Sequence, residues 1–139
     1  MFTTRRAMRI EWGDCDAAGI VFYPRYFAMF DAATHHHVEE AGWGRAELAR
    51  AFDIIGFPMV DTRAKFLLSS SYGDDIVIET RVTAMRRSSF DVEHRVFRGE
   101  ALAIEAFETR VWSGRHPEDP SRLKGREIPE PVRRRLGEA

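Results

Sequence analysis

The chain has 139 residues, of which 44% are apolar and 12% aromatic, a composition that suits one folded domain over residues 1–139 and excludes a disordered chain. Its 21 lysines and arginines against 22 aspartates and glutamates give a net charge of -1, so overall charge supports neither nucleic-acid binding nor attachment to an acidic membrane. The one cysteine, Cys15, excludes an internal disulfide, and because the sequence has no apolar leader and no apolar run of membrane length we expect a cytoplasmic protein.

The first predicted element is a strand at residues 5–11, where polar and apolar side chains alternate. A long helix follows, with Pro24 fitting its first turn and Gly42 ending it. Its length of about 18 residues corresponds to a rod of about 27 Å. Apolar side chains occupy most of the helix circumference, which predicts a helix that is buried nearly all round.

The rest of the chain is predicted to be mainly sheet. Residues 45–52 have helical propensity without caps and form a short helix or an ordered loop. Four strands follow, at residues 59–69, 76–84, 90–97 and 101–112, and the last three make an antiparallel meander. The proline-rich tail, about residues 114–139, is predicted to be loop-rich with an exposed end. A strand, a buried helix and then four antiparallel strands indicate the α+β class.

The sequence lacks several motifs that would direct its chemistry elsewhere. G-x-S-x-G, G-x-x-x-x-G-K-[ST] and a G-x-G-x-x-G after a strand are absent, which removes the usual support for nucleotide hydrolysis and for a dehydrogenase. His35, His36 and His37 do not indicate a metal site, because consecutive helical side chains point about 100° apart. We interpret them as a polar stripe or a subunit contact. His94 lies on the apolar face of its strand and is interpreted as a hydrogen-bonded core residue.

An acidic loop that precedes the long helix could carry chemistry. The amino end of a helix offers unpaired N–H groups and a partial positive charge, which can polarise a carbonyl and stabilise an oxyanion. Here the amides of residues 20–23 would be the donors. Asp16, a few residues upstream, could act beside them as a nucleophile or as a general base for water in ester or thioester hydrolysis. The alternative is that Asp16 only caps the helix.

The run from Glu11 to Phe27, EWGDCDAAGIVFYPRYF, closely resembles the signature of the hotdog-fold acyl-CoA thioesterases of the 4-hydroxybenzoyl-CoA thioesterase type. Further segments match at residues 30–33, 56–60, 71–74, 78–80 and 86–90, so the resemblance spans about residues 5–112. It implies a hotdog fold, in which an antiparallel β-sheet wraps around a long central α-helix. That architecture agrees with the element order predicted above.

The resemblance also implies roles for individual residues. The catalytic carboxylate of the family falls on Asp16, and the backbone amide that polarises the substrate carbonyl falls on Tyr23. Asp31 matches a position that reaches the acyl ring across the subunit interface, which implies a homodimer or homotetramer with sites shared between chains. Arg86 and Arg87 match basic residues that meet the phosphates of coenzyme A, a role that suits the guanidinium group. The resemblance implies no metal and no bound cofactor.

Two positions depart from the family pattern. Ser88 stands where the family pattern has a lysine after the arginine pair, so the phosphate contact is either weaker or rebuilt from Arg122, Lys124 or Arg126. Phe57 replaces a threonine that lines the acyl pocket, which changes the shape of the pocket and removes a hydroxyl. The identity of the acyl group is therefore less well defined than the reaction.

We therefore predict an acyl-CoA thioesterase that hydrolyses a benzoyl or hydroxybenzoyl thioester. The alternatives are a thioesterase for short aliphatic acyl-CoA and a non-catalytic acyl-CoA or acyl-carrier binding module. Structural interpretations of the site residues also stay open. Asp31 could be a helix-face residue paired with Arg25, Thr34 or His35, and the arginine pair could be a solvated turn between strands.

Overall fold

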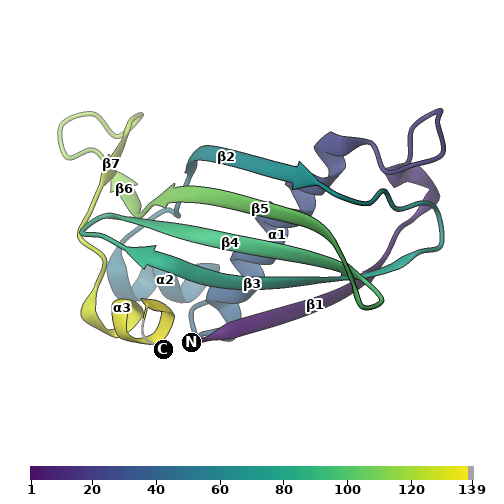
Figure 1. Ribbon diagram of the computed structural model, residues 1–139. Coiled ribbons are helices and arrows are strands. Elements are labelled where there is room, and N and C mark those ends of the chain that lie inside the picture. The colour runs from purple at the N-terminus through teal and green to yellow at the C-terminus, as the bar shows by residue number, and fades with distance from the viewer. Residues whose placement is uncertain (138–139) are drawn as a thin grey trace.

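The computed structural model describes residues 1–137 and consists of one five-stranded antiparallel sheet and a long helix, with two short helices and a two-stranded sheet at one end (Figure 1). The elements, in chain order, are β1 (Thr3–Arg9), a short 3-10 helix η1 (Trp12–Asp14), α1 (Tyr23–Glu40), α2 (Arg45–Phe52), β2 (Met59–Phe66), β3 (Asp75–Met85), β4 (Ser89–Arg98), β5 (Ala101–Val111), β6 (Ser113–Arg115), β7 (Leu123–Gly125) and α3 (Glu130–Gly137). The strand order in the large sheet is β1-β3-β4-β5-β2. The predicted α+β class and the meander β3–β4–β5 are confirmed.

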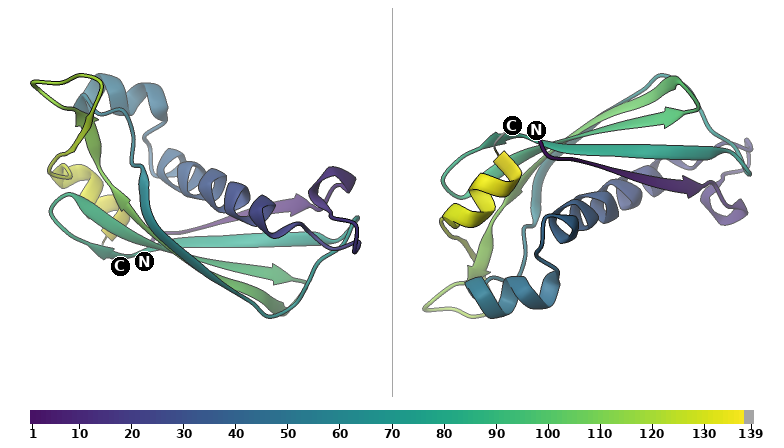
Figure 2. Two further views of the ribbon diagram at one scale, coloured as in Figure 1. Left: turned by 90° about the horizontal axis from the view of Figure 1, so that it is seen from above. Right: turned by 90° about the horizontal axis from the view of Figure 1, so that it is seen from below.

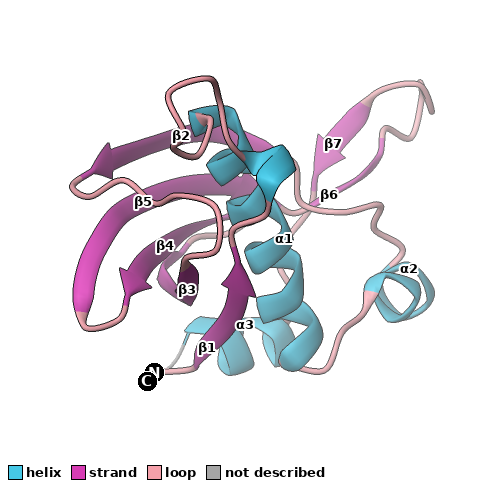
Figure 3. Ribbon diagram, turned by 90° about the vertical axis from the view of Figure 1, so that its right-hand side faces the viewer, coloured by secondary structure: helices cyan, strands magenta, loops and turns pink. Residues whose placement is uncertain are grey.

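Helix α1 begins and ends where the sequence predicts. Pro24 occupies its first turn, where the missing N–H costs no hydrogen bond, and Gly42 follows its last turn with φ +117°, a conformation that suits glycine. The helix has 18 residues and runs along one face of the curved sheet (Figures 2 and 3). Phe30 and Ala33 are among its side chains that pack against the sheet residues Ile78 and Ile104.

The prediction that α1 is buried nearly all round is wrong for this chain. Asp31, His35 and Glu39 lie at i, i+4 spacing and are exposed along one side of the helix. His37, which was predicted to belong to a polar stripe, is instead buried against β1. Its Nδ1 lies 2.7 Å from the hydroxyl of Thr4. The helix is therefore amphipathic, with one open face.

The C-terminal tail is part of the core, which corrects the predicted loop. Ile128, Val132 and Leu136 are at most 1% exposed and pack with Trp112 and Val38 under one end of the sheet. They repeat at i, i+4, i+8, the spacing of a helical stripe, and α3 carries the last two. The prolines do not prevent this helix, since a proline in the first turn of a helix is tolerated. Among residues 1–137, no helix combines the length and the apolar character needed to cross a membrane.

Buried His37 should make the folded chain sensitive to mild acid. Burial lowers the pKa of His37 to about 4, and the charges of His94, His36 and Arg135 add to this effect. Because the unfolded chain binds this proton near pH 6.5 and the folded chain only near pH 4, stability is full above pH 6.5 and falls as the pH falls between these values. The loss from this one group is about 3 kcal/mol at pH 4.

Urea unfolding at fixed protein concentration between pH 7 and pH 4 measures this loss. His37→Gln removes this titration. Between pH 7 and pH 4, the free energy of unfolding of the variant should therefore fall by about 3 kcal/mol less than that of the wild type. His36→Gln, at the neighbouring half-buried position, is the matched control and should keep the wild-type slope. Parallel slopes for the wild type and His37→Gln would contradict the assignment.

Candidate active site

The loop between η1 and α1 is fixed by its own hydrogen bonds. Asp14 is used structurally, because its Oδ2 accepts a hydrogen bond of 2.9 Å from the amide of Glu11. The Asp16 amide donates to the carbonyl of Ile20 at 2.9 Å, and the Asp16 Oδ1 accepts from the amide of Ala18 at 2.9 Å. Gly19 closes the turn with φ +84°. Asp16 is therefore held in an exposed tight turn beside Ile20.

Asp16 does not cap α1. The N-cap position is Phe22, and no side chain donates or accepts a capping hydrogen bond there. Within residues 1–137, the Asp16 carboxylate also has no ion-pair partner. The interpretation of Asp16 as a helix cap is therefore wrong, and its carboxylate is available for another role.

The amides at the amino end of α1 are not all available. Of the four predicted donors, the amide of Val21 donates to the carbonyl of Ser70 at 2.9 Å, and that of Phe22 donates to the carbonyl of Asp14 at 2.8 Å. The amide of Tyr23, the first residue of α1, has no partner in the described part of the chain. The loop thus occupies the amides of Val21 and Phe22. The amide of Ile20 also has no backbone partner within residues 1–137, but only that of Tyr23 belongs to α1, at the positive end of the helix dipole.

A hollow of about 220 Å³ lies beside this amide. It is lined by Ile20, Val21, Tyr23 and Tyr26 together with residues 66–70. The hydroxyls of Tyr26 and Ser70 are buried here, and neither meets hydrogen-bond geometry with a partner within residues 1–137. Burial raises the pKa of Tyr26, an effect that the nearby Ser70 partly offsets. Because buried polar groups are usually paired, the two hydroxyls indicate room for a polar ligand atom or water. No pattern in the sequence pointed to either residue.

Asp31 lies on the open face of α1, eight residues after Tyr23, which corresponds to about 12 Å along the helix. Its side chain is 57% exposed, and its Oδ1 lies 2.9 Å from Nη2 of Arg110, with Nδ1 of His35 3.7 Å from Oδ2. Of the pairings predicted for Asp31, the one with His35 is present as a long contact, whereas Arg110 was missed. Asp31 and Tyr23 of one chain are therefore separate along the helix.

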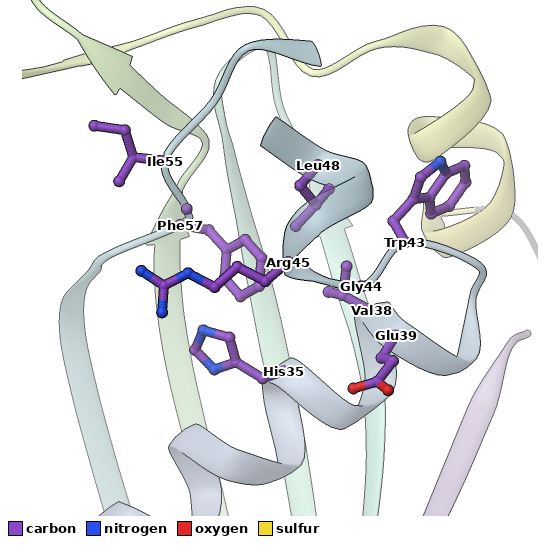
Figure 4. A pocket seen from close by; sticks show the side chains of 10 residues that line it. His35, Val38, Glu39, Trp43, Gly44, Arg45, Leu48, Ile55 and Phe57 are labelled. Atoms are coloured by element: carbon purple, nitrogen blue, oxygen red, sulfur yellow. The ribbon is translucent and has the colours of Figure 1, made fainter. Parts of the chain in front are cut away.

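Phe57 is 3% exposed and lies at a second hollow, of about 270 Å³, beyond the middle of α1 (Figure 4). His35 and Arg45 line the same hollow, and the ring of His35 is 4.7 Å from that of Phe57. The Phe57 carbonyl accepts a hydrogen bond of 3.3 Å from Arg110. Arg110 and His35 thus join Phe57 to Asp31, so the two residues predicted for the acyl pocket lie in one neighbourhood.

The arginine pair lies in the turn between β3 and β4, at the end of the sheet away from the amino end of α1 (Figure 1). Arg86 is already paired, through two hydrogen bonds to Asp91 and one of 2.8 Å to the hydroxyl of Ser89. This pairing lowers the pKa of Asp91 and raises that of Arg86. The Arg87 side chain has no hydrogen-bond partner within residues 1–137, so it is the available cation of the two.

The tail covers this turn. The amide of Ile128 donates to the carbonyl of Arg87 at 2.8 Å, and Arg133 donates to the carbonyl of Arg86 at 2.6 Å. Of the residues predicted to replace the missing lysine at Ser88, Arg126 is occupied by Asp53. Lys124 instead precedes Gly125, which lies against Ser88.

The structure thus groups the predicted site residues in three places. Asp16 and Tyr23 lie at one end of α1, Asp31 and Phe57 lie near its middle, and the turn of residues 86–88 lies at the other end. Within residues 1–137, no group of three or more histidine, cysteine, aspartate or glutamate side chains could hold a metal ion.

A family model described as the thioesterase-like superfamily matches residues 10–136. The chain belongs to this superfamily. It is 38% identical over 129 residues to the 4-hydroxybenzoyl-CoA thioesterase of Pseudomonas sp. (strain CBS-3), covering 87% of this chain and 88% of that relative. It is 23% identical over 133 residues to the acyl-CoA thioester hydrolase YbgC of Escherichia coli O157:H7, covering 92% and 91%.

Solved structures of superfamily members agree with the fold of this thioesterase-like chain. An aspartate-to-asparagine mutant of 4-hydroxybenzoyl CoA thioesterase, complexed with 4-hydroxybenzoyl CoA, matches with a TM-score of 0.90 and 32% identity over 98% of this chain and 99% of that one. The gentisyl-coenzyme A thioesterase BH1999 matches with a TM-score of 0.79 and 32% identity over 96% and 99%. The predicted hotdog fold is confirmed.

Proposed function

We propose that this chain hydrolyses an aromatic acyl-CoA, with a benzoyl or hydroxybenzoyl group, to the free acid and coenzyme A. The observation that carries the proposal is the amide of Tyr23, which is left without a partner at the helix amino end while the amides of Val21 and Phe22 are used. Asp16 lies in the preceding turn, where its carboxylate accepts a hydrogen bond from the amide of Ala18 but has no ion-pair partner within residues 1–137. The substrate class is supported by 38% identity over 87% of the chain to an enzyme named for 4-hydroxybenzoyl-CoA.

In the proposed reaction, the thioester carbonyl oxygen accepts a hydrogen bond from the amide of Tyr23. The helix dipole adds positive potential where negative charge develops on that oxygen. Asp16 either attacks the carbonyl carbon or removes a proton from the attacking water. The carbon–sulfur bond then breaks, and the coenzyme A thiolate leaves and takes up a proton. Where Asp16 has attacked, water hydrolyses the resulting mixed anhydride, which releases the free acid and restores the carboxylate. No step requires a metal or a bound cofactor.

The proposed site is shared between two chains. Asp31 lies about 12 Å along α1 from Tyr23, and the turn between β3 and β4 that carries Arg87 lies at the end of the sheet away from the Asp16 loop. One chain therefore does not gather the acyl and phosphate contacts around its own Asp16. The unpaired edge strand β2 and the exposed side chains of Tyr23 and Val60, 61% and 63% exposed, offer surface for a second copy. A homodimer, or a homotetramer built from dimers, follows from this proposal.

Arg87→Ala should raise KM for the CoA thioester about tenfold, because it removes a charged hydrogen-bond donor to phosphate. Arg86→Ala is the matched control from the same turn and should raise KM less, since Asp91 already uses its guanidinium. A truncated thioester that lacks the nucleotide should show the same KM with all three proteins. Equal effects on the full and the truncated substrate would contradict a phosphate contact.

The proposed function is tested by comparing kcat/KM for benzoyl-CoA, 4-hydroxybenzoyl-CoA and two short aliphatic acyl-CoA thioesters. A preference for the aromatic substrates supports the proposal, and a preference for the aliphatic ones corrects the acyl class while it retains the reaction. Tight binding of every thioester without release of thiol would overturn the enzymatic role.

A further inference from the structure

A charged cluster lies buried between α1 and the sheet, and the proposed reaction does not use it directly. Glu108 and Arg110 on β5 are 3% and 2% exposed, and His94 on β4 is completely buried. Nε and Nη2 of Arg110 donate to the two carboxylate oxygens of Glu108, each at 3.1 Å. Nε2 of His94 lies 3.3 Å from Glu108 Oε1.

Two threonines complete the hydrogen bonds of this cluster. The Thr34 hydroxyl, from α1, donates to Glu108 at 2.6 Å, and the Thr80 hydroxyl, from β3, lies 2.8 Å from Nδ1 of His94. Burial alone would raise the pKa of Glu108, but the hydrogen bonds from His94 and Arg110 outweigh it and lower this pKa to about 2. Glu108 is therefore a fixed anion that holds Arg110, and the prediction that His94 is a hydrogen-bonded core residue is confirmed.

Stability alone gives little reason to keep such a cluster, since replacing a buried ion pair by well-packed neutral residues is often neutral or stabilising. Its contacts outside the core point to another role. Nη2 of Arg110 reaches Asp31 Oδ1 at 2.9 Å, and Nη1 donates to the Phe57 carbonyl at 3.3 Å. The cluster therefore ends on Asp31 and Phe57, the two residues that the family resemblance places at the acyl group.

We infer that Arg110 is a positioning residue for substrate selection, which rests on the proposed function. Held by Glu108, it fixes the carboxylate of Asp31 through Oδ1 and leaves Oδ2 on the open face of α1. There Oδ2 accepts a hydrogen bond from the acyl group bound in the site of a second copy. The planar guanidinium of Arg110 is hydrogen-bonded to Glu108 and to the Phe57 carbonyl, so the Asp31 carboxylate is oriented before substrate binds. The acyl groups selected are rings that carry a hydroxyl or an amino group.

The test uses a double variant, Glu108→Gln with Arg110→Met, which removes both buried charges at similar volume and so avoids an unpaired charge. The measured quantity is the ratio of kcat/KM for 4-hydroxybenzoyl-CoA to that for benzoyl-CoA. We expect the ratio to fall about tenfold, the size of one charged hydrogen bond. Asp31→Asn should give the same fall, and combining all three substitutions should add nothing, because the residues act as one unit.

A second ion pair provides the matched control. Arg81 on β3 lies 2.8 Å from Glu93 on β4, and Glu93→Gln with Arg81→Met should leave the ratio unchanged. An equal loss with both substrates in the Glu108→Gln, Arg110→Met variant would mean a purely structural cluster and would overturn the inference. Dissociation constants of non-hydrolysable thioether analogues of the two substrates give the same ratio without turnover. A chain that discriminates between the analogues through Arg110 but does not hydrolyse thioesters would refute the proposed function and support the inference.

Discussion

Asp16→Asn should lower kcat by about 10²- to 10⁴-fold and leave the fold intact. The substitution preserves the shape of the side chain and the Oδ1 acceptor for the amide of Ala18, so the tight turn keeps its hydrogen bond. It removes the negative charge that either attacks the carbonyl or activates water. KM should change little, because the amide of Tyr23 and the phosphate contacts are untouched. Steady-state kinetics on 4-hydroxybenzoyl-CoA measure this loss.

Asp75→Asn is the matched control, since Asp75 is also exposed and begins β3. This variant should hydrolyse thioesters at the wild-type rate. Turnover of Asp16→Asn within a few fold of the wild type would remove Asp16 from the mechanism. In the wild type, a single turnover in ¹⁸O-labelled water tests for direct attack, because label that enters the Asp16 carboxylate requires a covalent acyl intermediate on that residue.

Glu108→Gln should lower the free energy of unfolding by about 3 kcal/mol or more. The change removes the anion that holds Arg110 and His94 in the core, and Arg110 then keeps only the half-exposed Asp31 as a charged partner. Urea denaturation at one protein concentration measures the loss. Glu105→Gln, on the opposite face of the same strand, is the control and should change stability by less than about 0.5 kcal/mol.

The double variant described above distinguishes charge from volume. Glu108→Gln with Arg110→Met should recover most of the stability lost by Glu108→Gln alone, because no unpaired buried cation is left. A loss below about 1 kcal/mol for the single variant would show that water or local rearrangement stabilises Arg110, and the buried cluster would then be less rigid than its hydrogen bonds indicate.

The elements defined by local signals could be predicted from the sequence. Pro24 and Gly42 mark the limits of α1, and the alternation of side chains marks β3, β4 and β5 within about two residues. The tail was mispredicted because its prolines suggested a loop, although Ile128, Val132 and Leu136 already carried helical spacing. In that segment the burial of an apolar stripe outweighed the local signal for a turn.

The finer features of the site depend on contacts between distant parts of the chain. Which amides at the start of α1 are available is decided by the carbonyls of Ser70 and Asp14, and no local pattern near Tyr23 encodes that choice. The partner of Asp31 is Arg110, which is brought to it by the register of β5. Sequence resemblance indicated the roles of Asp16 and Asp31, which stay predictions, but the side chains that support them emerge only from the folded chain.

The placement of the loop of Asp16 and the arginine turn at opposite ends of the same chain ties turnover to assembly. If the site is shared between two chains as proposed, a monomer keeps Asp16 but does not have Arg87 beside it to bind the phosphates of coenzyme A. Dilution that dissociates the dimer would then abolish thioester hydrolysis without unfolding the chain. A surface substitution that merely loosens the pair would mimic a catalytic defect, although every reacting atom remained in place.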